Sequence, residues 1–445
     1  MQINIRRVGI FFLGIFLWQQ AEALPAYARQ TGMNCAGCHV GGMGPQLTPF
    51  GQSFKIGGYT LRNSSDFILP LSAMLVATYE HTAKDLPDPA GPHDKSNNNV
   101  NLQEASLFVA GALTEHVGSF AQMTYSDVDR LVVLDNVDIR YANQTEWLGK
   151  GTTYGVSLNN NPGLQDPWNN LPAWRFTYTA SALAPTPGAA TLINGGLEQQ
   201  VIGASVYAYW NSNVYAEFGT YQSLSPTFLD DVNVGSDAGQ IAHTAPYWRI
   251  AYNTDINGQS IMVGLFGLRA DLYPDHHAGL QNHYDDVGID TSYQYLMSGN
   301  HQVTFNGSYV HEKQKLDYSL ANGDASRDSL YLNELNFNIA YYFQNTYGFR
   351  LGYSRSTGSS DNILYAPSPL DGSRSGKPDS SAYTFQVDWT PFGKQESWGA
   401  PWANIRVGVQ YIDYLRFNGS SNNYDGFGRD AADNNTLYLF VWTAI

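Results

Sequence analysis

Apolar and polar residues alternate along many short stretches of this chain. Residues 335–341 (LNFNIAY), 383–389 (YTFQVDW) and 405–411 (IRVGVQY) are examples. Alternation with a period of two places one set of side chains on each face of a β-strand. Sixteen strands are predicted in this way, near residues 67–78, 101–113, 117–126, 135–143, 152–160, 200–210, 214–223, 247–254, 260–270, 286–297, 301–313, 330–343, 347–356, 382–389, 404–417 and 435–445.

The two faces of these strands favour a membrane barrel over a soluble sandwich. One face carries Tyr, Trp and Phe as often as Leu or Val, and the other carries Asn, Gln, Asp, Arg and Gly. A membrane barrel turns apolar residues towards lipid and polar residues towards its lumen, and it places aromatic residues at the interfaces. A secreted, water-soluble all-β protein is the alternative.

The connections between the predicted strands tend to alternate in length. Residues 211–213 and 344–346 form tight connections, whereas residues 161–199 and 357–381 form long ones. Short turns on one side and long loops on the other are typical of outer-membrane barrels. We therefore predict an all-β fold, a porin-like 16-stranded antiparallel transmembrane β-barrel over residues 63–445.

The first residues have the pattern of a targeting segment. Arg6 and Arg7 precede an apolar stretch at residues 8–18, and Ala21-Glu22-Ala23 then fits a small-x-small cleavage pattern. These features predict a signal peptide over residues 1–23. The alternative is a membrane anchor, but 11 apolar residues are too few to span a bilayer, which takes about 20.

Charge and composition narrow the functional classes. The 445 residues include 24 Lys and Arg against 39 Asp and Glu, so the formal net charge is −15. A chain this acidic has little to offer nucleic-acid phosphates, and no nucleic-acid partner is expected. Only 14% of the residues are charged and another 14% are aromatic, which excludes a coiled coil and a charged disordered chain.

The most specific chemical signal follows the predicted signal peptide. Cys35-Ala36-Gly37-Cys38-His39 is a C-x-x-C-H motif, the attachment signature of a c-type haem. Two thiols three positions apart reach both vinyl groups of one haem, and the adjacent imidazole reaches the iron. We predict one haem c, bound covalently by Cys35 and Cys38, with His39 as the proximal iron ligand. A redox-active dithiol and half of a zinc site are the alternatives.

The second axial ligand of the iron stays open. Met33 and Met43 lie close to the motif in sequence, and such residues tend to stay on the proximal side of the ring. The Gly41-Gly42 pair lets the chain loop back, which keeps Met43 as a candidate. The candidates are therefore Met43, Met74, His81, His93 or an open position.

Residues 24–60 carry a wider resemblance. They read LPAYARQTGMNC, then the C-x-x-C-H histidine, Pro45, LTPFG at 47–51, Phe54-Lys55 and Gly58-Tyr59. This segment resembles the N-terminal haem segment of the fused cytochrome–porins, the outer-membrane iron oxidases of iron-oxidising bacteria. The resemblance extends more loosely over the whole chain, including residues 159–174 (NNNPGLQDPWNNLPAW).

The resemblance implies a fold and a function. In that family a monohaem cytochrome segment, here residues 24–62, precedes a sixteen-stranded barrel in the bacterial outer membrane. The implied function is oxidation of extracellular Fe(II), with the electron passed to a periplasmic c-type cytochrome, so that the chain would act as an iron:cytochrome c oxidoreductase. The alternatives are a conduit for another donor or acceptor, and a porin whose haem is structural or sensory. No catalytic residue is predicted.

A segment of about 40 residues is too small to fold on a core of its own. We therefore expect residues 24–62 to plug the barrel lumen. Lumen-facing arginines are candidates to pair with the haem propionates, and pairing with lumen acids such as Asp138 and Asp388 is the alternative. These arginines are Arg140, Arg249, Arg350 and Arg406.

The long loops are acid-rich. Asp230, Asp231 and Asp237 lie in one, and the His276–Asp286 loop combines histidines with carboxylates. An acidic mouth concentrates divalent cations, and His with carboxylate suits ferrous iron. The His276–Asp286 loop is therefore a candidate metal-binding loop, and the alternative is that these acids only keep the surface soluble.

Overall fold

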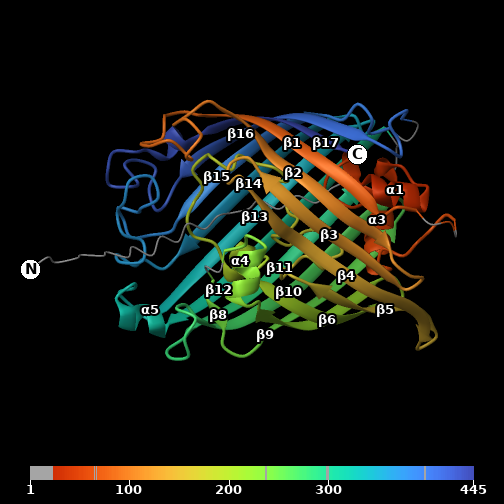
Figure 1. Ribbon diagram of the computed structural model, residues 1–445, viewed down its shortest axis with the longest axis horizontal. Helices are drawn as coiled ribbons and strands as arrows, with labels where there is room; N and C mark the ends of the chain where they lie inside the picture. The colour runs from red at the N-terminus through yellow and green to blue at the C-terminus, as the bar shows by residue number, and fades with distance from the viewer. Residues whose placement is uncertain (1–23, 65, 67, 236–237, 297–299, 395–396) are drawn as a thin grey trace, which may run out of the picture.

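The computed structural model describes residues 24–445, apart from residues 65, 67, 236–237, 297–299 and 395–396. The predicted signal peptide lies outside the described residues. Sixteen long antiparallel strands in the described part of the chain form one sheet, with a two-residue strand, β8, beside them. The strands, most of which are labelled in Figure 1, are β1 (Leu71–Thr82), β2 (Asn99–Ala112), β3 (Val117–Ser126), β4 (Leu131–Trp147), β5 (Lys150–Asn159), β6 (Val201–Trp210), β7 (Val214–Ser223), β8 (Gln240–Ile241), β9 (Ala245–Ile256), β10 (Gln259–Tyr273), β11 (Asn282–Tyr295), β12 (His301–Leu316), β13 (Ser329–Phe343), β14 (Tyr347–Gly358), β15 (Ser380–Trp389), β16 (Asn404–Arg416) and β17 (Thr436–Ala444).

The sheet closes on itself. β1 pairs with β2 on one side and with β17 on the other, from Met74 opposite Ala444 to Thr82 opposite Thr436. Closure leaves no strand edge, so every backbone polar group of the wall can pair within the sheet, as a lipid environment requires. The predicted sixteen-stranded antiparallel barrel is therefore confirmed.

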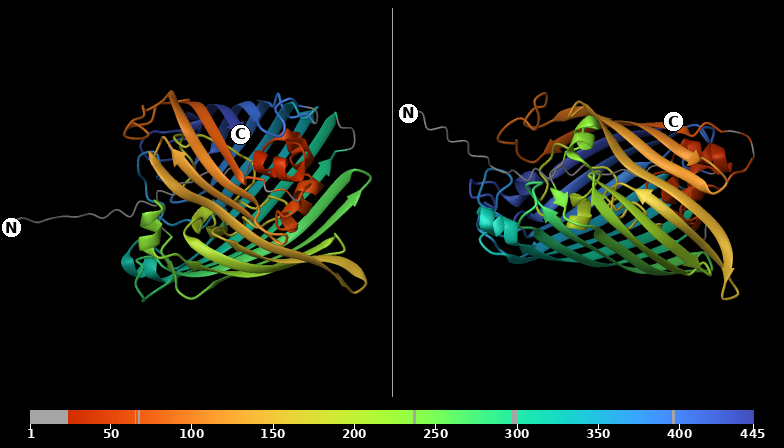
Figure 2. Two further views of the ribbon diagram at one scale, coloured as in Figure 1. Left: turned by 45° about the vertical axis from the view of Figure 1, so that its right-hand side comes forward. Right: turned by 60° about the horizontal axis from the view of Figure 1, so that its bottom comes forward.

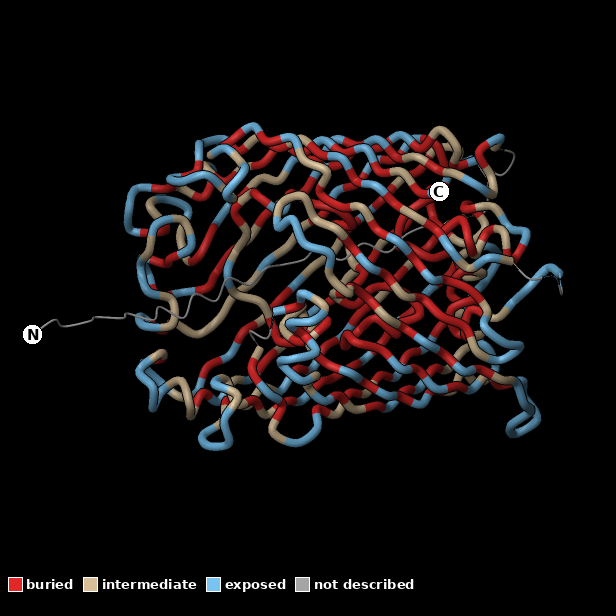
Figure 3. Tube along the Cα trace, in the orientation of Figure 1, coloured by how far each residue is buried: buried red, intermediate tan, exposed pale blue. Residues whose placement is uncertain are grey.

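Burial alternates along the strands in the way that the sequence predicts. In β1, Met74, Val76 and Thr78 are buried and face the lumen, whereas Leu75, which is 45% exposed, faces outward. Figure 3 shows this alternation of buried and exposed residues over the wall. Exposed Leu, Val, Ile, Phe and Tyr side chains on the outside form the apolar surface that lipid covers.

The two ends of the barrel differ. Tight turns follow β6, β9 and β13, and their central residues have the left-handed backbone that two-residue hairpins need. Asn211 and Ser212 have φ of 52°, and Gln344 and Asn345 have φ of 55° and 52°. β1 begins and β17 ends at this end, which we call the turn end. The long connections lie at the opposite end, the loop end, and include α4 (Pro226–Asp231), α5 (Asp317–Asn322) and η3 (Ala431–Asn434).

The segment that precedes β1 lies inside the barrel at the turn end. It forms α1 (Pro25–Thr31), α2 (Cys35–Cys38), η1 (Val40–Gly42) and α3 (Pro49–Ile56). Figure 2 shows this helical segment, in red, surrounded by the strands of the barrel. Side chains of several strands bind it: Asn404 donates to the Gly42 carbonyl (2.8 Å) and Tyr207 to that of Ile56 (2.7 Å). The predicted position of residues 24–62 in the lumen is confirmed.

A second segment enters the lumen from the loop end. Residues 160–200, the lumenal loop, connect β5 to β6 and include η2 (Leu192–Gly196). Gln103 of β2 and Gln410 of β16 donate to the carbonyls of Ala180 and Thr179 (2.9 and 3.0 Å). On another side of the wall, Asp286 of β11 accepts from the backbone N–H of Ile193 (2.8 Å). The loop therefore crosses the lumen from wall to wall.

Among the described residues, none of the helices has both the length and the apolar character that a transmembrane helix requires.

A candidate cofactor cavity in the lumen

The C-x-x-C-H motif is folded into one helical turn. The Asn34 side chain caps α2 by accepting from the Gly37 N–H (3.0 Å), and the His39 N–H donates to the Cys35 carbonyl (2.8 Å). Asn is a favoured N-cap residue because its short side chain satisfies a backbone donor that the helix leaves unpaired. The turn brings the two cysteines and His39 to the border of one cavity.

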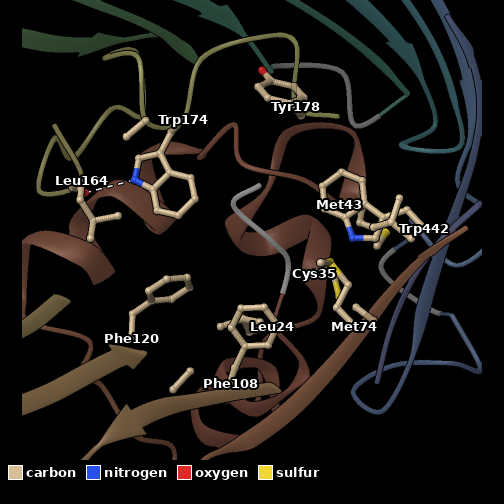
Figure 4. Packing of buried hydrophobic residues seen from close by; sticks show 14 of the residues in the cluster. Leu24, Cys35, Met43, Met74, Phe108, Phe120, Leu164, Trp174, Tyr178 and Trp442 are labelled. Atoms are coloured by element: carbon tan, nitrogen blue, oxygen red, sulfur yellow. Dashed lines mark hydrogen bonds between the residues drawn. The ribbon is translucent and has the colours of Figure 1, made fainter. Parts of the chain in front are cut away.

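About 680 Å³ of space, part of it open to solvent, lies at this site, and its lining is mostly apolar and aromatic. Leu24, Cys35, Phe120 and Trp174 line it, and Figure 4 shows them within the buried apolar cluster. Pockets for cofactors are usually concave and apolar, with a few polar groups that fix orientation. The lining residues outside the motif are Leu24, Tyr27, Ala28, Met33, Asn34, Leu47, Gly51, Phe54, Lys55, Tyr59, Phe120, Asn169 and Trp174.

The donor set fits a c-type haem. Both cysteines are free. Nδ1 of His39 is buried and has no hydrogen-bond partner within the described structure. Burial lowers the pKa of His39 to about 4, with the charge of Arg406 acting in the same direction and a hydrogen bond to the Gly44 backbone opposing it. His39 is therefore neutral near pH 7, the form in which an imidazole can ligate iron.

The two alternatives for the cysteines fit less well. A redox-active dithiol needs a lowered thiol pKa, but burial raises the pKa of Cys38 to about 12 and also raises that of Cys35. A structural zinc site needs four ligands. In the part of the chain that the structure describes, no group of three or more His, Cys, Asp or Glu side chains is placed to hold a metal ion.

The structure separates the candidates for a second axial ligand. Met43 and Met74 are buried in the apolar cluster that includes Cys35 and Trp442, but they do not line the cavity. His81 is wrong as a candidate because it lies on the outer face of β1, with Nδ1 3.1 Å from Asn98. His93 is wrong because it lies in the connection that follows β1 at the loop end. The sequence left both candidates open because sequence distance does not report strand direction or face.

Met33 and Lys55 line the cavity instead. Met33 packs beside the motif: a Cβ placed on Gly37 would lie 2.8 Å from Cε of Met33. This proximity agrees with the expectation that Met33 stays on the side of the motif.

Lys55 is the cavity residue that sequence reasoning missed as a functional group. It is 5% exposed, and its Nζ donates to the Leu164 carbonyl (2.6 Å) and to Oδ1 of Asn169 (2.8 Å). Burial lowers the pKa of Lys55 to about 7, and the charge of Arg140 acts in the same direction. No acidic side chain lies within 4 Å of this amine among the described residues. The amine is thus the lining group best suited to meet an anionic substituent of a cofactor.

Three of the four lumen arginines pair with acids, as in the alternative considered above. Arg140 is 2.8 Å from Asp138. Arg249 is 2.8 Å from Asp290 and 3.2 Å from Asp166. The same holds for Arg406, which lies 3.3 Å from Asp388.

Arg350 has a different environment. It donates to the hydroxyls of Tyr178 (2.9 Å) and Tyr342. None of the four arginines lines the cavity, so the structure does not place them to pair with a group held there.

Gly41 and Gly42, which follow the motif, pack so closely against the barrel wall that no side chain would fit at either position. Gly41 and Gly42 have φ of 71° and 75°. A Cβ on Gly41 would lie 2.3 Å from the Tyr342 ring, and one on Gly42 would lie 2.6 Å from the Gly393 backbone. Nη2 of Arg406 donates to the Gly41 carbonyl (3.2 Å). This stretch therefore fixes the motif against the wall.

The lumenal loop closes the cavity on the other side. Nδ2 of Asn169 donates to the Pro45 carbonyl (2.8 Å), and Nε1 of Trp174 donates to the Leu164 carbonyl (3.1 Å). Lys55 links α3 to the same loop. Residues 159–174, which contribute loosely to the resemblance, thus form one wall of the cavity.

The His276–Asp286 loop does not assemble a metal site. His283 is 2.7 Å from Asp271, whereas Asp286 points into the lumen, where it accepts from the Ile193 N–H. Among the described residues of this loop, no set of ligands converges. The metal-binding expectation for this loop is therefore not supported.

The fold and the site together define a class of protein. A closed sixteen-stranded barrel with an apolar exterior and a plugged polar lumen is a porin-like β-barrel of the bacterial outer membrane.

No family model and no curated protein matches the sequence. Solved structures that it resembles include outer-membrane proteins. The anion-selective porin from Comamonas acidovorans matches with 12% identity, over 84% of this chain and 98% of that one, at a TM-score of 0.46. The channel DcaP of Acinetobacter baumannii has 12% identity over 84% and 96%, at 0.44. OmpT of Vibrio cholerae has 8% identity over 84% and 95%, at 0.40. The fold assignment rests on the strand pairing above and not on these scores.

Proposed function

We propose that this protein transfers electrons at the outer membrane through one haem c, bound covalently by Cys35 and Cys38 with His39 as iron ligand. The observation that supports this proposal is the cavity. The two cysteines and the histidine of the motif border one apolar space inside the barrel, and the imidazole of His39 is buried and neutral. When bound, a c-type haem supplies one-electron transfer, with a potential that its axial ligands and burial set.

The residues of the chain have defined tasks in this proposal. Phe54, Phe120 and Trp174 exclude water from the cavity, which lowers the local dielectric constant. Lys55 places an amine at the same border and joins it to the lumenal loop.

The position of the cavity suggests the order of electron transfer. The motif lies at the turn end, which faces the periplasm in outer-membrane barrels, and Met33 is 36% exposed there. A periplasmic c-type cytochrome is the partner that can reach this end. The electron donor is extracellular Fe(II) in our proposal, attracted by the acidic loops at the other end. Its electron then has to cross the lumenal loop to reach the cavity. The protein would then be an iron:cytochrome c oxidoreductase.

A conduit for another donor or acceptor uses the same site and is the second candidate. A porin with a structural or sensory haem is disfavoured by the lumenal loop, which crosses the lumen from β2 and β16 to β11. A diffusion pore needs an open path that this arrangement fills.

Two measurements test the proposal in sequence. The first is peroxidase staining on a denaturing gel, where we expect a band at the mass of the protein and its loss in Cys35→Ser/Cys38→Ser. A wild-type protein without this band would refute haem attachment. The second mixes the oxidised protein with ferrous iron and follows the haem absorption bands. Bands that stay oxidised would exclude Fe(II) as donor and leave the second candidate.

A further inference from the structure

Two arginines lie side by side on the outer surface of the barrel near the loop end. Arg355 of β14 is opposite Ser381 of β15, which is opposite Arg416 of β16. Arg355 shares its strand face with Phe349 and Leu351, which are 52% and 41% exposed. The row Arg355–Ser381–Arg416 therefore faces outward and not into the lumen.

The row lies just beyond an aromatic pair that marks a membrane interface. Tyr353 is opposite Tyr383, and their ring centroids are 5.1 Å apart on the same outer face. Tyrosines gather where the hydrocarbon region meets the headgroups. Arg355 is the next residue after Tyr353 on the outer face of β14, towards the loop end. The two arginines are thus at headgroup level in the outer leaflet.

The surface is hollowed between the two arginines. The register of β15 against β16 shifts at Ser381, and such an irregularity bends a strand and displaces its neighbours. A notch lies there, and its lining includes Arg355, Arg416, the hydroxyl residues Thr357 and Ser381, the apolar side chain of Leu415 and the acidic residue Asp379. Basic, hydroxylic and apolar groups thus border one recess, together with one carboxylate.

Other basic residues on the same rim lie opposite an acid in the strand register, whereas the two arginines of this notch do not. Arg269 and Lys313 both lie opposite Asp285 in the register of β10, β11 and β12. By contrast, Arg355 lies between Leu335 and Ser381 in the register, and Arg416 lies opposite Ser381. Among the described residues, the acid within 4 Å of Arg416 is Asp379, at 3.5 Å, and that carboxylate also accepts from the Gly358 N–H.

We propose that the Arg355–Arg416 notch binds the phosphate of an outer-leaflet lipid headgroup. Guanidinium groups match phosphate oxygens in pairs, and the hydroxyls of Thr357 and Ser381 supply further donors. Leu415 and Tyr353, on the membrane side of the notch, offer an apolar surface to the acyl chains. The site is separate from the cofactor cavity and does not depend on haem attachment.

The test measures lipid retention by the purified, haem-carrying protein in detergent, using native mass spectrometry. The probes are lipid A with its phosphates, dephosphorylated lipid A and inorganic phosphate. We expect Arg355→Gln/Arg416→Gln to retain at least about tenfold less phosphorylated lipid A than wild type, because two charge-assisted contacts are lost. Arg269→Gln, an exposed arginine on the same rim that faces Asp285, is the matched control and should match wild type.

Equal retention by the double variant and Arg269→Gln would overturn the proposal, and so would equal retention of the dephosphorylated lipid by wild type. Displacement of bound lipid A by millimolar inorganic phosphate would show that the notch takes the free anion, and would overturn the lipid assignment. Heat-modifiable gel mobility reports barrel assembly. If the double variant does not assemble, Arg355→Gln alone is judged by the same comparison, with Arg355→Lys expected to retain more lipid than Arg355→Gln.

Discussion

At the scale of single residues, Lys55 shows how the fold changes the chemistry of a side chain. A lysine in water has a pKa near 10.4, but the buried amine of Lys55 faces only neutral acceptors, Leu164 and Asn169. Its charged form is therefore penalised, and its pKa falls to about 7. The residue titrates in the physiological range only because α3 and the lumenal loop enclose it.

This shift predicts a pH-dependent stability. Between the folded pKa of about 7 and the unfolded value, the unfolded chain binds more protons than the folded one. The free energy of unfolding should therefore rise with pH above 7, by up to about 1.4 kcal/mol per unit. We expect this rise in Cys35→Ser/Cys38→Ser, whose cavity holds no covalent group, when urea midpoints are measured from pH 6 to 9.5. Adding Lys55→Met should flatten it, and an unchanged pH profile would contradict the assignment.

Gly41 gives a second prediction at this scale, with an internal control. Gly41 and Gly149 both have φ of 71°, so alanine suffers the same backbone strain at each. Only at Gly41 does the new Cβ meet another group, the Tyr342 ring at 2.3 Å, whereas nothing lies within 4 Å at Gly149. Gly41→Ala should lower the free energy of unfolding by roughly 1–3 kcal/mol more than Gly149→Ala, because the core is overpacked. Equal urea midpoints for the two variants would contradict this prediction. They would show that the backbone near Gly41 or the Tyr342 ring moves to accept the new Cβ.

At the scale of elements, the lumenal loop is held by a buried carboxylate. Asp166 accepts from the backbone N–H groups of Trp168, Asn170 and Leu171 (2.8–3.1 Å). It also lies 3.2 Å from Arg249 of β9. One side chain therefore shapes a turn of the loop and ties it to the wall.

Removing this carboxylate should release the loop while the barrel persists. We expect Asp166→Ala to make residues 160–200 sensitive to limited proteolysis, because a buried ion pair and three hydrogen bonds are lost together. Asp129→Ala, an exposed aspartate in the β3–β4 turn, should leave the cleavage pattern unchanged. Cleavage that is no faster in Asp166→Ala than in this control would mean that the other contacts hold the loop.

The strands were predictable because a wall with lipid on one side and a polar lumen on the other imposes a period of two. The sequence placed the start of β4 near residue 135, but the strand begins at Leu131, because Leu131–Leu134 break the alternation that marks the rest. The lumenal loop has no such period, so its path across the lumen could not be read from the chain. The cavity was predictable only at its motif, since Lys55, Phe120 and Trp174 come from three other segments.

At the scale of the whole molecule, two insertions from opposite ends meet inside one barrel. Residues 24–62 enter at the turn end and residues 160–200 at the loop end, and Lys55 and Asn169 join them. A sixteen-stranded barrel without insertions is wide enough for an aqueous channel. The insertions therefore decide whether this barrel conducts solutes or houses a site.

This arrangement predicts a closed pore. In planar lipid bilayers we expect the wild-type protein to show no stable open-channel current, because the lumenal loop contacts β2, β11 and β16 across the lumen. Replacing residues 162–198 by a short Gly-Ser linker should open a conducting path, since the wall strands do not need the loop for their pairing. Replacing α4 by the same linker keeps the lumenal loop in place and should leave the pore closed. Steady porin-like conductance of the wild type would contradict a closed lumen. A passive channel would then be the best-supported candidate function.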